Sequence, residues 1–236
     1  MRPLPVDLLV LRSLQVFRWG YPSFLTLALL FYSPVILLRI FTPSLEDEGA
    51  SGLLVVVAIF LLLPVASAAL VYGVFHGLRG AKTTLGQCVT VAMQRGPSII
   101  ALAICSSAVS IAGYILCIVP GVVLFCGLFL AGPALVIEKM EPLEAMRRSW
   151  ALTEGYKLTI FLLAFAIGVV QMGLKILVDM AFGVSTFDLT LPPPEGYGLY
   201  AALIDAVTII TTAFNGIAAG VAYNDIRALR EGVDEL

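Results

Sequence analysis

Charge is scarce in this chain: Asp, Glu, Lys and Arg make up 13% of its 236 residues, about half the share usual in soluble domains. With so few charges and a mean hydropathy of +1.00, a soluble globular domain is excluded. The composition indicates an integral membrane protein instead. A spanning helix takes about 20 residues, so residues 1–236 are predicted to form a single membrane domain with no sizeable part outside the bilayer.

Histidine is almost lacking, because His76 is the only one. Zinc hydrolysis needs clustered His, Asp or Glu ligands, and a Ser-His mechanism needs a histidine beside its serine. The sequence offers neither pattern, and it has no Gly-rich phosphate loop. We therefore expect no enzymatic activity, no metal and no cofactor. The net charge of −2 also argues against a nucleic-acid partner.

Long apolar runs are what the chain has in plenty. Six of them are long enough to cross a hydrocarbon core: residues 22–41, 53–76, 97–117, 120–138, 157–181 and 199–223. The third and fourth are separated chiefly by "IVPG". Since proline removes a helix donor and glycine supplies a left-handed turn position, Pro120-Gly121 is predicted to form a tight turn between two helices. The predicted fold class is an all-α integral membrane protein with six transmembrane helices in three hairpins.

Basic residues gather at one end of these spans. Twelve of the 14 fall there: Arg2, Arg12, Arg18, Arg79, Lys82, Arg95, Lys139, Arg147, Arg148, Lys157, Arg227 and Arg230. The other end has Arg39 and Lys175, and its two longer loops are acidic. Because cytoplasmic connections carry the excess of Lys and Arg, both termini are predicted to be cytoplasmic.

Each basic connection has the same plan, a mostly amphipathic stretch followed by glycine or proline and then a span. The stretches cover residues 6–22, 85–97 and 142–156. We interpret the chain as three units, about 1–78, 79–138 and 139–236, each with a cytoplasmic interfacial helix and a hairpin. This is a repeat of architecture rather than of close sequence.

The third stretch, "EPLEAMRRSWALTEG", is the clearest interfacial helix. Its predicted face repeats at helical spacing: Leu143, Met146, Trp150 and Thr153. Glu144 is expected to reach Arg148 at i+4, Pro142 suits the first turn and Gly155 the stop.

Tryptophan beside arginine is typical of a helix at headgroup depth, where the ring lies at the interface and guanidinium groups meet lipid phosphates. The candidate lipid- or interface-contacting residues are therefore Trp19, Arg147, Arg148 and Trp150. The alternative is that this helix packs on the cytoplasmic ends of the protein's own spans, and the two roles can coexist.

Polar residues form a stripe on each of the last two spans: Gln171, Lys175 and Asp179 on the fifth, and Asp205, Thr208, Thr212 and Asn215 on the sixth. Ionisable groups inside a membrane usually face a partner or water. One hypothesis is a Lys175–Asp205 contact that lines a small polar cavity or fastens the hairpin. The alternative is that Lys175 pairs with Asp179 on its own helix and that the threonines bond their own backbone carbonyls.

Two further patterns concern packing at the span ends. The motif "YNDIR" ends the last span, and a cytoplasmic anchor is predicted from Glu138, Tyr223, Asp225 and Arg227, with Asp225 contacting Arg147 or Arg148. Glycines four apart in "GVFHG" (73–77) and "GIAAG" (216–220) allow close backbone approach. That approach serves either one chain or a homo-oligomer.

The stretch from Ile118 to Lys157 and the later "GVAYNDIRALREG" resemble the membrane domain of some bacterial glycerophosphoryl diester phosphodiesterases and its stand-alone relatives. The matching positions are Pro120, Gly121, Pro133, Glu138, Glu144, Ala145, Arg147, Arg148, Ser149, Trp150, Leu152, Gly155, Tyr223, Asp225 and Arg227. The resemblance implies a multi-spanning helical fold in a bacterial cytoplasmic membrane. It does not imply hydrolysis, which in the fused proteins belongs to a separate soluble barrel.

The expected function is thus that of a non-catalytic bacterial inner-membrane protein acting through lipid contact or partner binding, in membrane organisation or sensing. Its expected partners are membrane lipids and either another membrane protein or a second copy of the chain. The alternative is a small transporter or lipid-translocating protein that uses the two polar stripes.

Overall fold

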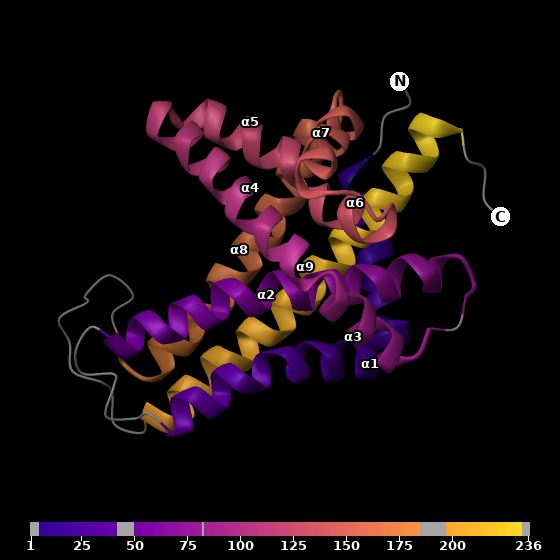
Figure 1. Ribbon diagram of the computed structural model, residues 1–236. Coiled ribbons are helices and arrows are strands. Elements are labelled where there is room, and N and C mark those ends of the chain that lie inside the picture. The colour runs from indigo at the N-terminus through magenta and orange to yellow at the C-terminus, as the bar shows by residue number, and fades with distance from the viewer. Residues whose placement is uncertain (1–4, 42–49, 82, 185–196, 233–236) are drawn as a thin grey trace.

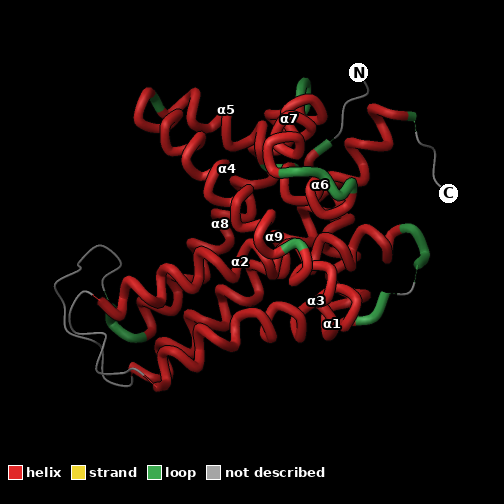
Figure 2. The backbone as a smooth tube through the Cα atoms, in the orientation of Figure 1, coloured by secondary structure: helices red, strands yellow, loops and turns green. Residues whose placement is uncertain are grey.

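The computed structural model describes residues 5–41, 50–81, 83–184 and 197–232, and these ranges are helical with short turns and loops (Figure 2). The helices are α1 (Val6–Phe41), α2 (Ala50–Leu78), α3 (Leu85–Gln94), α4 (Gly96–Leu116), α5 (Ile118–Leu128), α6 (Ala131–Ile137), α7 (Pro142–Thr153), α8 (Lys157–Ala181) and α9 (Tyr197–Glu231) (Figure 1). The all-α prediction is confirmed for the described residues.

Among the described residues, five helical segments are long and apolar enough to cross a membrane: Val56–Leu78, Gly96–Leu116, Ile118–Ile137, Lys157–Ala181 and Gly198–Glu231. A sixth candidate lies in α1, whose halves Val6–Arg18 and Pro22–Leu38 meet at 85°. Proline at the start of the second half removes a helix donor, which accounts for a break there. The chain is therefore an integral membrane protein with five to six spans, each overlapping a predicted apolar run.

Helices α1, α2 and α9 pack against one another and hold much of the buried core (Figure 1). The helices α9 and α2 approach closely at Gly216 and Gly220, since an added Cβ there would lie 3.0 Å from Leu70 Cβ and 3.1 Å from Val74 Cγ1. The "GIAAG" spacing thus serves packing within the chain. In "GVFHG", a Cβ on Gly73 would lie 3.3 Å from Cys88 Sγ, whereas one on Gly77 would meet nothing within 4 Å. Within the chain, close approach therefore occurs at Gly73 alone of this pair.

The helices α4 and α5 lie side by side and splay away from α1 and α2 (Figure 1). They touch where an added Cβ on Gly113 would lie 2.9 Å from Gly121 Cα. The chain turns at Cys117, whose backbone is extended at φ −173° and ψ 157°. The predicted turn at Pro120-Gly121 is therefore corrected: Pro120 lies in the first turn of α5, and Gly121 permits close contact with α4.

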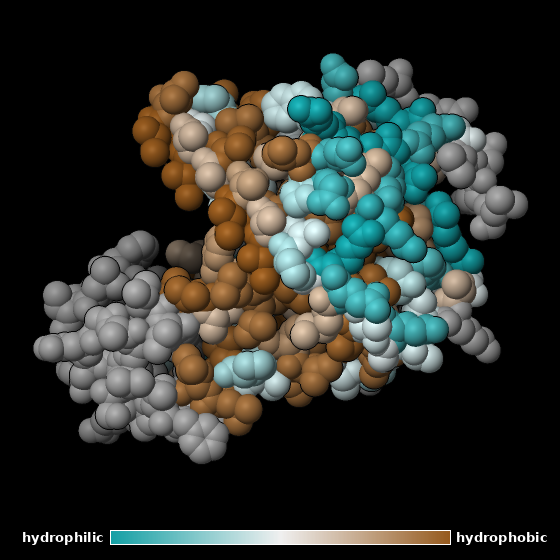
Figure 3. Space-filling model, in the orientation of Figure 1, coloured by the Kyte–Doolittle hydropathy of each residue, from teal (hydrophilic) through white to brown (hydrophobic). Residues whose placement is uncertain are grey.

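The surface is divided between polar and apolar regions (Figure 3). Hydrophilic side chains cover one end, where α6, α7 and the last turns of α9 meet; we call this the polar end. The flanks are hydrophobic, and Ile115 and Leu116 at the far tip of α4 are largely exposed. Exposed apolar side chains on spanning helices are what contact with lipid tails requires.

Candidate functional site

The helix α7 begins and ends as its sequence predicts. Pro142 occupies its first turn after Glu141, whose backbone is extended. Gly155, two residues after the helix, has φ +82°, a left-handed conformation that favours glycine. Together they fix α7 as a separate short helix between the spans of α5–α6 and α8.

The buried face of α7 differs from the predicted one. Ala145, Ser149, Leu152 and Thr153 are buried. Leu143 is 63% exposed and Trp150 39% exposed, so of the predicted face only Thr153 is fully covered by protein. The predicted face is therefore wrong for Leu143 and Trp150, which lie at its exposed edge. Ala145, Ser149 and Leu152 form the protein-facing side of α7, and Met146 packs against the core from an intermediate position.

Ser149 attaches α7 to the break between α5 and α6. Its hydroxyl donates to the carbonyl of Gly127 over 2.7 Å and accepts from the amide of Leu130 over 3.1 Å. The hydroxyl of Thr153 also donates to the Gly127 carbonyl, over 3.4 Å. A helix break deprives backbone groups of their usual partners, and a buried group left unpaired is costly. The serine was missed as a site residue because its sequence neighbours do not reveal that a helix breaks nearby.

Trp150 packs on the protein with one part of its side chain and is 39% exposed. An added Cβ on Gly127 would lie 2.3 Å from Trp150 Cε3, so the ring rests on the backbone of α5. The ring also carries Lys157 Nζ at 3.4 Å from its centroid, a cation–π contact. The rest of the side chain is exposed beside Arg147, which is exposed on the same helix. Trp19 lies in α1, but its side chain is outside the described part of the structure.

A second connection holds α7 to α6 and α9. We call it the Glu138 cluster, and it consists of Glu138, Arg148, Tyr223, Arg227 and Glu231. Arg148 Nε lies 3.1 and 3.0 Å from the two carboxylate oxygens of Glu138, and its Nη2 lies 3.0 Å from Oε1. Tyr223 donates to Glu138, and Arg148 also pairs with Glu231. Arg227 Nε donates to Glu231 over 2.8 Å and lies 3.8 Å from Glu138.

The charged form of Arg148 is stabilised by the two carboxylates of this cluster. Burial disfavours the guanidinium of Arg148, but hydrogen bonds and charges from Glu138 and Glu231 outweigh it and raise the pKa of Arg148 above its ordinary value. Arg148 is thus occupied by protein carboxylates rather than offered to lipid. The predicted Glu144–Arg148 pair is corrected accordingly, because the partners of Arg148 are on α6 and α9.

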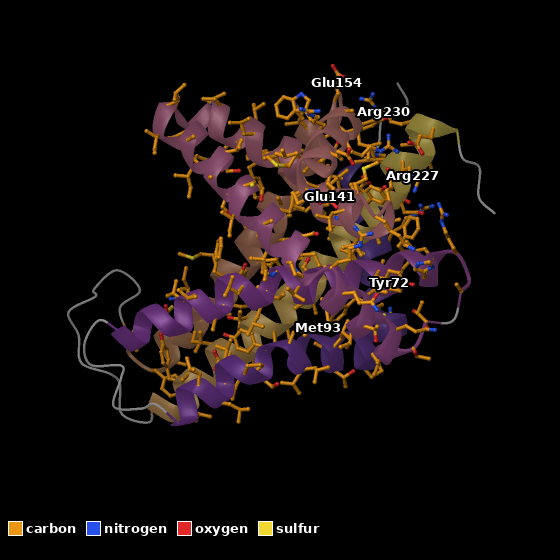
Figure 4. All side chains as sticks on the ribbon, viewed as in Figure 1. Tyr72, Met93, Glu141, Glu154, Arg227 and Arg230 are labelled. Atoms are coloured by element: carbon orange, nitrogen blue, oxygen red, sulfur yellow. The ribbon has the colours of Figure 1, made fainter. Side chains whose placement is uncertain are left out.

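The predicted anchor residues all lie at the polar end, but one partner differs. Asp225, whose side chain is 7% exposed, pairs with Arg12 of α1 at 2.9 Å rather than with Arg147 or Arg148. Asp225 therefore joins α9 to α1, and Glu138, Tyr223 and Arg227 join α9 to α6 and α7. Figure 4 shows Glu154 and Arg230 at the same end. There, Arg230 donates to the Glu154 carbonyl.

The polar stripes of α8 and α9 do not meet through Lys175 and Asp205. Lys175 Nζ lies 2.8 Å from Asp179 on its own helix, the alternative considered above. The hydroxyl of Tyr200 donates to Asp179 over 3.0 Å, and that of Tyr32 donates to Asp205 over 3.0 Å. Asp205 thus contacts α1.

The remaining stripe residues also have local or outward positions. Thr208 donates to the carbonyl of Ile204, one turn earlier, over 2.9 Å. Gln171 and Asn215 are exposed, and Thr212 is half-buried. Some residues of the two stripes therefore contact other side chains of the bundle, and the others face outward or bond their own helix.

No protein-family model matches this chain, and neither a curated protein nor a solved structure does. The fold and the site define a class of protein: a multi-pass helical membrane protein in which a short helix, α7, is attached at the polar end. The resemblance to the phosphodiesterase-linked membrane domain stays a prediction. A function has to be argued from the contacts of the chain itself.

Proposed function

We propose that this protein is a non-catalytic component of the bacterial inner membrane that binds anionic lipid headgroups through α7. The observation that carries the proposal is the orientation of α7. The helix is fixed to the protein by Ser149 and Thr153 while Leu143 and Trp150 point outward. Leu152 and Met146 of the same helix pack into the bundle, so α7 has large apolar side chains on both its protein-facing and its outward-facing sides, as suits a helix between protein and lipid.

The proposal places the polar end at the cytoplasmic face. Most basic residues of the sequence belong to connections at that end, and the positive-inside rule then puts both termini in the cytoplasm. In this arrangement the six spans form three hairpins, each preceded by an interfacial helix: the first half of α1, α3 and α7.

Headgroup chemistry fits the side chains around α7. Tryptophan favours the depth between lipid tails and water, and Trp150 rests on Gly127 in the last turn of α5, where α5 breaks before α6. Arg147 and Lys157 flank it with positive charge, and each basic group near an anionic surface contributes about 1 kcal/mol. Phosphate-bearing anionic lipid is therefore the class of ligand that suits the site.

The Glu138 cluster supports a role in membrane sensing or organisation. It connects α7 to the end of α6 and to α9 through bidentate and branched ion pairs. Lipid that binds at α7 therefore acts on a helix that is firmly attached to the bundle, so a change in the lipid is transmitted to the spans.

The transporter alternative receives less support from the contacts. Asp179 and Asp205 each accept a tyrosine hydroxyl, and Lys175 pairs within α8. Of the two cavities described, one lies between α2, α4 and α6 and the other between α1 and α2, and neither is lined by a stripe residue. The stripes are thus better suited to fastening helices.

A lipid-binding measurement tests the proposal. The purified protein is incubated with phosphatidylglycerol or phosphatidylcholine, and bound lipids are counted by native mass spectrometry. We expect phosphatidylglycerol to be retained in preference. Arg147→Ser should weaken its binding about fivefold, the equivalent of the roughly 1 kcal/mol per basic residue, and Arg147→Lys should restore it. Glu144→Ser, an exposed change on the same helix, is the control. Equal binding by Arg147→Ser and wild type would refute the role of α7.

A further inference from the structure

A cleft lies on an apolar flank of the molecule, and none of its lining residues belongs to α7. Its walls are α2, α4 and the segment from Leu128 to Pro133, and its volume is about 270 Å³. Figure 3 shows the surface hollowed between the α4–α5 pair and α2, with hydrophobic side chains on both sides. The cleft arises because α4 and α5 splay away from the rest of the bundle.

The walls of the cleft belong to three candidate spans, Val56–Leu78, Gly96–Leu116 and Ile118–Ile137. Where these helices cross a membrane, the cleft faces hydrocarbon. Phe60, one of the lining residues, is 43% exposed, so the cleft is open towards the surrounding bilayer. Water in an apolar opening at this depth would lack hydrogen-bond partners, which disfavours it as the occupant.

Most side chains that line the cleft are apolar, although serines also contribute to the lining. Three serines line the cleft, Ser67, Ser106 and Ser107, and the hydroxyl of Ser106 donates to the carbonyl of Ala103 on its own helix over 3.2 Å. The other lining residues have apolar side chains or are glycine. Serine bonded in this way does not require a polar ligand. The chemistry of the walls therefore favours an apolar occupant.

The size of the cleft selects among apolar occupants. About 270 Å³ lies just below the range of pockets for drug-sized ligands, roughly 300–1,000 Å³. A helix of a second copy is about 10 Å across with its side chains, so one turn of it takes about 420 Å³, more than the cleft holds. A slender chain of methylene groups fits such a space.

Gly132 keeps the floor of the cleft open. A Cβ added there would meet no atom within 4 Å, and its backbone is helical. Close packing therefore does not require glycine at this position. A larger side chain at residue 132 would occupy the cleft.

We propose that this cleft holds one acyl chain of a bilayer phospholipid. The attraction comes from dispersion contacts of its methylene groups with α2, α4 and α6, which an empty groove would lack, because the hydrophobic effect does not act between apolar groups already in lipid. The site is independent of the headgroup contact proposed for α7, because the two surfaces share no residue. A phospholipid bound here would fill the space between the α4–α5 pair and the remaining spans.

Photocrosslinking tests this site. The protein is reconstituted in nanodiscs that contain a phosphatidylcholine with a diazirine on one acyl chain, and labelled peptides are mapped by mass spectrometry. We expect adducts to concentrate on the segments that line the cleft. Gly132→Leu should lower them at least fivefold, whereas Gly168→Leu should not. Gly168 is the matched control, since it is an exposed helical glycine on α8 whose added Cβ also meets nothing within 4 Å.

Ala103→Leu, on the opposite wall, is the second blocking variant if Gly132→Leu does not fold. Labelling spread evenly over the exposed faces of α4 and α8, or unchanged in a folded blocking variant, would overturn the proposal. Crosslinks from cleft residues to a second copy of the chain would overturn it too. Because this experiment uses a zwitterionic lipid and reads peptides of α2, α4 and α6, its outcome is separate from that of the headgroup measurement on α7.

Discussion

Arg148 of α7 and Glu138 at the end of α6 form a bidentate ion pair, with both carboxylate oxygens about 3 Å from Arg148 Nε. Glu138 is also the acceptor for Tyr223 of α9. One carboxylate therefore connects three helices at the polar end. The side chain of Glu138 is only 12% exposed, so solvent screens the pair weakly.

Glu138→Gln should destabilise the protein substantially. The substitution leaves the half-buried Arg148 without its bidentate partner, and hydrogen bonds to charged groups contribute about 1.5–3 kcal/mol each. We expect a loss of about 2 kcal/mol in unfolding free energy, measured by denaturant titration in detergent. Glu141→Gln removes the same charge from an exposed position three residues later and should have little effect. Equal stability of the two variants would show that the cluster is not structural.

Ser149→Ala tests the attachment of α7 to the helix break. The change deprives the Gly127 carbonyl and the Leu130 amide of their shared partner, and unsatisfied buried groups cost about 1–3 kcal/mol. We expect stability to fall by that amount and amide exchange at Leu130 to accelerate. Ser33→Ala is the control, since Ser33 bonds a carbonyl of its own helix. Unchanged exchange at Leu130 would contradict the assignment.

Gly127→Ala should displace the ring of Trp150. The new methyl would lie 2.3 Å from Cε3 of the ring, and overpacking of this kind costs about 1–3 kcal/mol. Tryptophan emission should shift as the ring moves. The double variant Gly127→Ala with Trp150→Ala should be no less stable than Trp150→Ala alone. If the double variant were less stable, contact with Trp150 would not be the cause.

The Tyr32–Asp205 hydrogen bond distinguishes a structural from a transport role for the sixth span. Tyr32→Phe and Asp205→Asn should each lower stability. In the double variant the losses should be non-additive, with a coupling of about 0.5–1.5 kcal/mol. Additive losses, together with solute flux in liposomes that requires Asp205, would favour the transporter alternative.

Apolar run length was enough to predict where the long helices lie, but not the break between α5 and α6 within the fourth predicted run. All six predicted runs overlap helices, and the 85–97 and 142–156 stretches contain α3 and α7. Run length and stop signals depend only on nearby residues, so they predict the position of each helix separately. The start of α7 at Pro142 and the left-handed Gly155 follow from the same local rules.

Contacts between helices were predicted less well. Asp225 was expected to meet α7 but pairs with Arg12, more than 200 positions earlier. Several charges share one depth at the polar end, so sequence alone cannot rank their pairings. Ser149 was missed for a related reason, since its partners arise from a break in another helix. The outward face of α7 likewise depends on which surface the bundle presents to it.

Depth-dependent quenching of Trp150 tests the central claim most directly. A Trp19→Phe variant, which leaves Trp150 as the one tryptophan, is reconstituted in vesicles of phospholipids brominated either near the headgroup or near the tail end. We predict strong quenching of Trp150 by the shallow bromines and weak quenching by the deep ones, as an interfacial ring requires. Emission that neither lipid quenches would mean that Trp150 is shielded by protein, and would contradict the proposal that α7 faces lipid.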